Sequence, residues 1–151
     1  MDKVELRAAL VTAFPPKTIT KDIIKDCQGA WEEYDNTSHF EFNVVNKTWQ
    51  SLDKNFLGLH ENALIYLGET AFRALQPAYL LYLIDNDDYG GIQYCVATVL
   101  TQKDDPLQLK TFKQRIKELT DLQQTVVKNI LLYLAQGHRK DIMIMALESY
   151  W

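Results

Sequence analysis

Three aspartates within four positions are the residues whose types and spacing best suit chemistry. They lie in the segment DNDDYGG and form, with its tyrosine, a cluster of four side chains: Asp85, Asp87, Asp88 and Tyr89. Carboxylates can bind calcium, but an EF-hand loop needs oxygen ligands at its first, third and fifth positions and a glutamate at its twelfth. Counted from Asp85, the fifth position is Tyr89 and the twelfth is Val96. The EF-hand pattern fails, and a weak surface calcium site is the remaining cation-binding alternative.

The same carboxylates are poorly placed for acid–base catalysis. Such catalysis needs one carboxyl group that is desolvated enough to keep its proton near neutral pH. The aspartates follow an apolar run, Ala78–Ile84, and precede a Tyr-Gly-Gly turn, where solvent reaches them. We therefore expect a solvated acidic turn, and contact with a protein partner is its functional interpretation.

Two cysteines and three histidines are the other residues of catalytic or metal-binding type: Cys27, Cys95, His39, His60 and His138. Neither cysteine belongs to a Cys-x-x-Cys pair, so we expect buried thiols rather than a disulfide or a zinc site. We expect His60 at the surface or at a helix end. The chain has no phosphate-binding P-loop, HExxH or GxSxG motif. The sequence therefore predicts no cofactor and no metal, and it does not point to an enzyme.

Charge is distributed unevenly along the 151 residues, whose net charge is −4. Residues 53–105 carry eight acids and three bases, whereas residues 106–151 carry four acids and seven bases. An acidic middle third attracts a basic partner and repels nucleic acid. The composition, 47% apolar and 24% charged, is typical of a soluble globular protein. We expect a single domain over residues 1–151.

The N-terminal segment and the apolar runs predict a cytoplasmic protein without membrane contact. The opening MDKVELRAAL is charged and amphipathic, with no signal-peptide core. The longest apolar run, Ala78–Ile84, is far shorter than the stretch of about 20 residues that a membrane-spanning helix needs.

Hydrophobic periodicity predicts an all-α fold of about seven or eight helices. Thr120 and Gln123 form an expected capping box, and Gly68 is expected to end a helix. Pro77 either begins a helix or interrupts a longer one. An alternation of apolar and polar residues near residues 40–45 instead predicts one short extended segment, formed by Phe40, Phe42 and Val44.

The order of several segments resembles a family of small, uncharacterised, all-helical bacterial proteins. The matching segments are WQSL at residues 49–52, AFRALQPAYL at residues 71–80, LQQTVVKNILLYLAQ at residues 122–136 and the final ESYW. Gln76 stands where the family usually has leucine, and the acidic turn is particular to this chain. The resemblance implies a shared structural core or pocket made of Trp49, Phe72, Arg73, Pro77, Tyr79 and Tyr82.

Arg73 is a lone base among apolar helical residues. It either pairs with a carboxylate inside the domain or faces a ligand. Tyr79 and Tyr82 are three residues apart on the expected helix and can line a groove beside the acidic turn.

These features favour an immunity-type inhibitor that binds and neutralises a cognate, basic, nuclease-like toxin through an acidic surface. Small size, the acidic balance and the absence of a catalytic motif all agree with this hypothesis. A cytosolic adaptor or structural protein is the alternative, followed by a small-molecule-binding enzyme with a pocket near Arg73. The partner is expected to be a protein, such as a toxin domain, and the sequence leaves the oligomeric state open.

Overall fold

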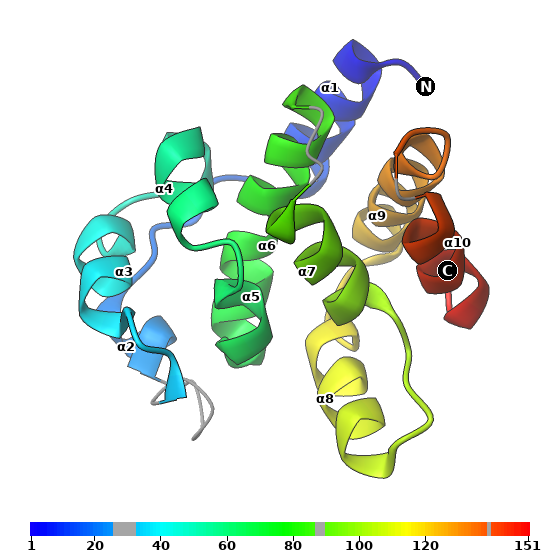
Figure 1. Cartoon of the computed structure of the whole chain (residues 1–151). Coiled ribbons are helices and arrows are strands. Elements are labelled where there is room, and N and C mark those ends of the chain that lie inside the picture. The colour runs from blue at the N-terminus through cyan, green and yellow to red at the C-terminus, as the bar shows by residue number, and fades with distance from the viewer. Residues whose placement is uncertain (26–32, 87–89, 139) are drawn as a thin grey trace.

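A computed structural model describes residues 1–25, 33–86, 90–138 and 140–151 (Figure 1). Within these ranges the chain forms α-helices and no strand, so the all-α expectation is confirmed. The described ranges hold ten α-helices rather than seven or eight: α1 (Lys3–Ala13), α2 (Lys21–Lys25), α3 (Thr37–Val44), α4 (Lys54–Leu59), α5 (Ala63–Tyr66), α6 (Glu69–Asp85), α7 (Gly91–Leu100), α8 (Pro106–Ile116), α9 (Asp121–Leu134) and α10 (Lys140–Ser149).

The extended segment expected near residues 40–45 is wrong, because those residues belong to α3. Phe40 and Val44 are four residues apart and both are buried, which is the spacing of one helix face. Phe42 points to the opposite side and is 87% exposed. The period-two alternation therefore reflected one exposed phenylalanine and not a strand.

The helix count is higher than expected because α3 replaces the expected extended segment and because the segment from Thr48 to Leu67 is broken. It contains a short 3-10 helix, η2 (Trp49–Ser51), followed by α4 and α5. His60 ends α4, and its backbone N–H bonds to the carbonyl of Phe56. The loop between α4 and α5 is where the candidate site lies.

Helix α6 passes through the middle of the molecule and contains Pro77 in its interior (Figure 1). Of the two alternatives for Pro77, the structure shows one long helix that contains the proline, and not a helix that begins there. Proline has no N–H, so the carbonyl of Arg73 lacks its usual helical donor. Ten residues of α6 are buried, and this packing holds the helix together across the proline. Gly68 begins α6 rather than ending the helix before it.

The other helices pack around α6 and each other. Helix α1 contacts α6 and α9, and α10 contacts α7 and α9, whereas α2 and α4 contact α6 from the other side (Figure 1). Trp49 anchors η2 in the core, since its indole N–H donates to the carbonyl of Phe14 at 2.9 Å. No described helix has the length and apolar character required to cross a membrane.

Candidate functional site

Of the four side chains in the predicted acidic cluster, the structure describes only Asp85. Asp85 is the last residue of α6, and its carboxylate accepts a hydrogen bond from Nε of Arg7 on α1 at 2.5 Å. Asp87, Asp88 and Tyr89 lie outside the described residues. The prediction that this turn contacts a partner therefore stays a prediction, and Asp85 already has an internal partner.

Arg73 pairs with a carboxylate inside the molecule. Its Nη2 donates to Oε2 of Glu118 at 2.8 Å, and its Nη1 donates to the carbonyl of Gln114 at 3.4 Å. The Arg73 side chain is 18% exposed. It links α6 to the end of α8, as the first of the two sequence interpretations expected.

The remaining residues of the expected core or pocket are mostly buried. Phe72, Pro77, Tyr79 and Trp49 are buried, and Tyr82 is half-buried. The Tyr79 hydroxyl donates to the carbonyl of His60 at 2.8 Å, so its polar end is turned into the protein. These side chains serve packing in the described structure. Of the two cysteines, Cys95 is a free, buried thiol, and Cys27 lies outside the described residues.

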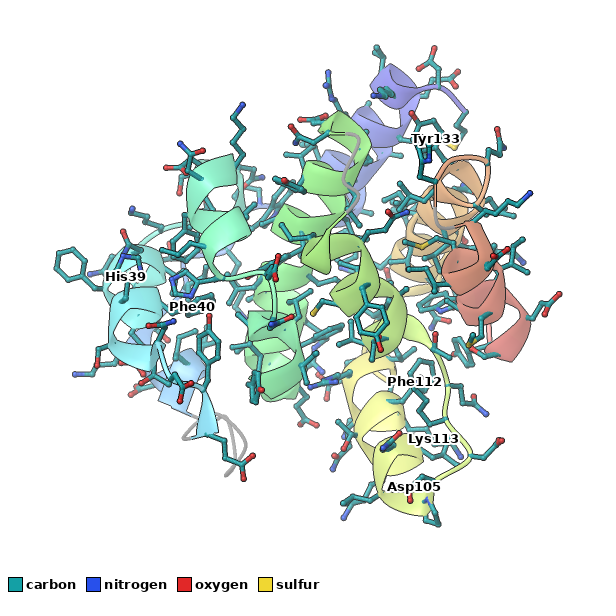
Figure 2. All side chains as sticks on the ribbon, in the orientation of Figure 1. His39, Phe40, Asp105, Phe112, Lys113 and Tyr133 are labelled. Atoms are coloured by element: carbon teal, nitrogen blue, oxygen red, sulfur yellow. The ribbon has the colours of Figure 1, made fainter. Side chains whose placement is uncertain are left out.

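A cluster that the sequence did not reveal forms around His60, which is fully buried. Its Nδ1 hydrogen-bonds with the Tyr34 hydroxyl at 2.5 Å, and its Nε2 with Nδ1 of His39 at 2.7 Å. Asn43 donates to the carbonyl of His39 at 2.8 Å and lies 3.4 Å from Nε2 of that ring. His39 and Phe40 both project from α3 in Figure 2. The expected helix-end position of His60 is confirmed, but the side chain does not lie at the surface.

Aromatic rings surround the His60 imidazole. The ring centroids of Phe56, His39 and Phe40 lie 4.8, 5.0 and 5.2 Å from its own. Burial lowers the pKa of His60, and the neighbouring His39 lowers it further. Burial also raises the pKa of Tyr34 to about 12. The phenol therefore stays protonated near neutral pH and is not activated as a nucleophile.

A hollow of about 430 Å³ opens beside this cluster. We call it the acidic cleft, and its lining residues are Glu33, Tyr34, Asp35, Asn36, Gly58, Leu59, Glu61, Asn62 and Tyr66. Three of them are carboxylates, and none is a lysine or arginine. The rings of Tyr34 and Tyr66 lie 5.3 Å apart at an interplanar angle of 31°. The described residues thus form a concave surface that is negative and partly aromatic.

Glu61 reaches from the cleft toward the start of α7. A Cβ atom at Gly91 would clash with the Glu61 carboxyl group, so glycine at the first position of α7 leaves room for this side chain. The positive end of the α7 dipole favours a carboxylate there. Local sequence does not indicate this contact, because 30 positions separate the two residues (91 − 61).

Two further hollows border α8, and neither is lined by Arg73. Their volumes are about 530 Å³ and 330 Å³, and both are lined by Ile65, Leu107, Thr111 and Arg115. Arg115 is committed to structure, because its Nη2 donates to the carbonyls of Ile65 and Leu67. Among the described residues, no group of three histidine, cysteine or acidic side chains is arranged to hold a metal ion.

The fold and the cleft define an all-α protein with a concave acidic surface. No protein-family model, curated protein or solved structure matches the chain. The resemblance to the small bacterial family therefore stays a prediction.

Proposed function

We propose that this chain is an immunity-type inhibitor, which binds and neutralises a cognate basic toxin, and that the acidic cleft holds a basic segment of that partner. The observation that carries the proposal is the lining of the cleft. Glu33, Asp35 and Glu61 contribute carboxylates, and no lysine or arginine is among the lining residues that the structure describes.

The physical basis is electrostatic focusing. A concave surface with charge of one sign concentrates the field, raises the local concentration of an opposite charge and accelerates association. The rings of Tyr34 and Tyr66 add a face for a guanidinium or ammonium group. Tyrosine is also enriched among residues that dominate protein–protein binding. A toxin whose active surface is basic, as a nuclease requires, fits this chemistry, and its inhibitor would act in the cytoplasm.

The acidic turn is a second candidate contact within the same proposal. The turn would bind the partner alone or together with the cleft. Charge-reversing substitutions in the turn and in the cleft distinguish these two cases. Because Asp85 bonds to Arg7, its substitution also removes a contact between α6 and α1. The fair comparison therefore uses Asp87 and Asp88 for the turn.

The test is co-expression of the chain with the products of its neighbouring genes, followed by size-exclusion chromatography and kinetic binding. We expect a 1:1 complex whose association rate falls with increasing salt. The double variant Glu33→Lys/Asp35→Lys should slow association by about tenfold or more. The matched control is Asp104→Lys, an exposed acid that does not line the cleft.

Two results would contradict the proposal. One is the absence of any toxin-like partner among the neighbouring products. The other is a complex that the cleft variant and the turn variant Asp87→Lys/Asp88→Lys both leave unchanged. Loss of binding only in the turn variant would move the interface from the cleft to the turn.

A further inference from the structure

Two side-chain hydrogen bonds join the two sides of the acidic cleft. Residues 33–36 line one wall, and residues 58–66 contribute the other. His60 lies between the walls and bonds through Nδ1 to Tyr34 and through Nε2 to His39, which lies on α3 directly after the first wall. These bonds, with the Tyr34–Tyr66 ring contact, hold residues 33–44 against residues 58–66.

The hydrogen bond between the two imidazoles tolerates one added proton but not two. A neutral imidazole has one N–H and one lone pair, whereas the charged form has two N–H groups. The 2.7 Å contact between Nδ1 of His39 and Nε2 of His60 needs one nitrogen to accept. It can form when both rings are neutral or when one is charged. When both are charged, two donors face each other and two positive charges meet.

We propose that the His39–His60 pair is an acid-sensitive latch, which holds the two walls of the cleft together and releases residues 33–44 from residues 58–66 when both imidazoles are charged. One added proton leaves the contact in place, because the ring that stays neutral can still accept. A second proton removes the last acceptor of the pair and breaks the contact. The consequence for a partner rests on the proposed function: a basic segment held between the walls is released in acid.

Linkage gives the sign of the pH dependence. The pKa of His60 is lower in the folded chain than the ordinary imidazole value of 6.5. Below that value the unfolded chain therefore binds more protons than the folded chain. The stabilising contribution of His60 is complete when the pH lies above the ordinary imidazole pKa, and it is lost as the pH falls through that pKa. An acid-released latch requires this direction of change.

Other titratable groups surround the pair and must be separated from it. They are Glu33, Tyr34 and Asp35 on the first wall, Glu41 on α3, Glu61 and Tyr66 on the second wall, Tyr79 on α6 and Cys95 on α7. Burial raises the pKa of Tyr34 and Cys95 to about 12 and raises that of Tyr79 too, so these three stay neutral in acid. The carboxylates act against the closed state of the latch, because negative charge in the cleft stabilises the charged form of the imidazoles.

The test is a pH titration of the full chain by nuclear magnetic resonance, from about pH 8 to about pH 5, which follows the ring nitrogens and the backbone amides. We expect the first proton taken up by the pair to leave the amides of residues 33–44 unmoved. Charging of both rings should then shift or broaden those amides reversibly, while the amides of α9 stay unchanged.

Three variants separate a latch from general acid sensitivity. His39→Asn should let His60 take its proton without movement of residues 33–44, because an asparagine oxygen can accept from the charged ring. His60→Phe should remove the step, and His138→Asn, at an exposed histidine outside the cluster, should leave it unchanged. His39 is exposed, so its variant serves even if His60→Phe fails to fold. An unchanged amide step in His39→Asn would overturn the latch, as would two charged rings without amide movement in the unaltered chain.

N-acetyl-arginine amide is the probe for the cleft. We expect acidification to lower the affinity of the cleft for this probe by a larger factor in the unaltered chain than in His39→Asn. In His39→Asn, only protonation of the carboxylates weakens binding. An amide step without any binding of the probe would support the latch and count against the proposed function. Binding with equal pH dependence in both chains would support the proposed function and overturn the latch's effect on it.

Discussion

At the scale of single residues, Gln76 is a buried amide for which the described residues supply no hydrogen bond. Its side chain is fully buried in α6, and neither Nε2 nor Oε1 has a partner among those residues. Burying an amide without hydrogen bonds costs about 1–3 kcal/mol. The buried environment of this side chain suits an apolar residue of similar size, such as leucine.

Gln76→Leu is therefore expected to raise the free energy of unfolding by about 1–2 kcal/mol, measured by urea denaturation. Gln93→Leu is the matched control, because Gln93 is equally enclosed in α7 but donates to the carbonyl of His138 at 2.7 Å. That control should lose stability. A destabilised Gln76→Leu would mean that the amide is satisfied in solution, for instance by a buried water molecule.

Residue identity indicated the ion pair of Arg73, which does not line the cleft. A lone arginine in an apolar helical segment needs an anion, and Arg73 finds it in Glu118. The segment LGLHENAL is also compatible with an exposed helix end, so it did not indicate that His60 would be buried. The burial of His60 depends on Phe56, four residues earlier on α4, and on Tyr34 and Phe40, which come from one distant segment of the chain.

At the scale of elements, side-chain caps fix where several helices begin. Asp2 and Glu5 form a reciprocal box at α1, and Thr120 and Gln123 form the predicted one at α9. Asp105 caps α8, since its Oδ1 accepts from the N–H groups of Leu107 and Gln108 at 3.1 and 3.0 Å. These contacts span only a few residues, so the sequence is sufficient to predict them.

Asp105→Ala is expected to lower the free energy of unfolding by about 1 kcal/mol, because two N–H groups of α8 lose their acceptor. Thermal or urea denaturation measures the change. Asp104→Ala removes the neighbouring exposed acid, which has no part in the cap, and should change stability by less than about 0.5 kcal/mol. Equal losses in both variants would contradict the assignment of the cap to Asp105.

At the scale of the whole molecule, aromatic side chains join helices that are distant in sequence. The Trp151 indole N–H donates to the carbonyl of Leu100 at 2.8 Å, which ties the segment after α10 to the end of α7. The Tyr150 ring meets Phe112 of α8 at 5.2 Å. Trp151 is half-buried and packs against the core, whereas Tyr150 is more exposed.

Trp151→Ala is expected to lower the free energy of unfolding by about 2–4 kcal/mol through lost apolar contact and a lost hydrogen bond. Tyr150→Phe is the conservative neighbour. It loses only the 3.2 Å hydrogen bond to Gln124, so its cost should stay below about 1 kcal/mol. Urea denaturation ranks the two, and a milder effect for Trp151→Ala than for Tyr150→Phe would contradict the role given to the indole.

The sequence by itself determined the helical class and the Thr120–Gln123 cap, because periodicity and capping depend on neighbours within a few residues. It failed near residues 40–45, where a short helix with one exposed phenylalanine imitates a strand pattern. Only the tertiary structure decided the acidic cleft and the Tyr34–His60–His39 network. The partners of His60 in this network are 26 and 21 positions away from it in the sequence. They meet because Phe40 of α3 packs against Phe56 of α4 and α4 contacts α6, which no local signal encodes.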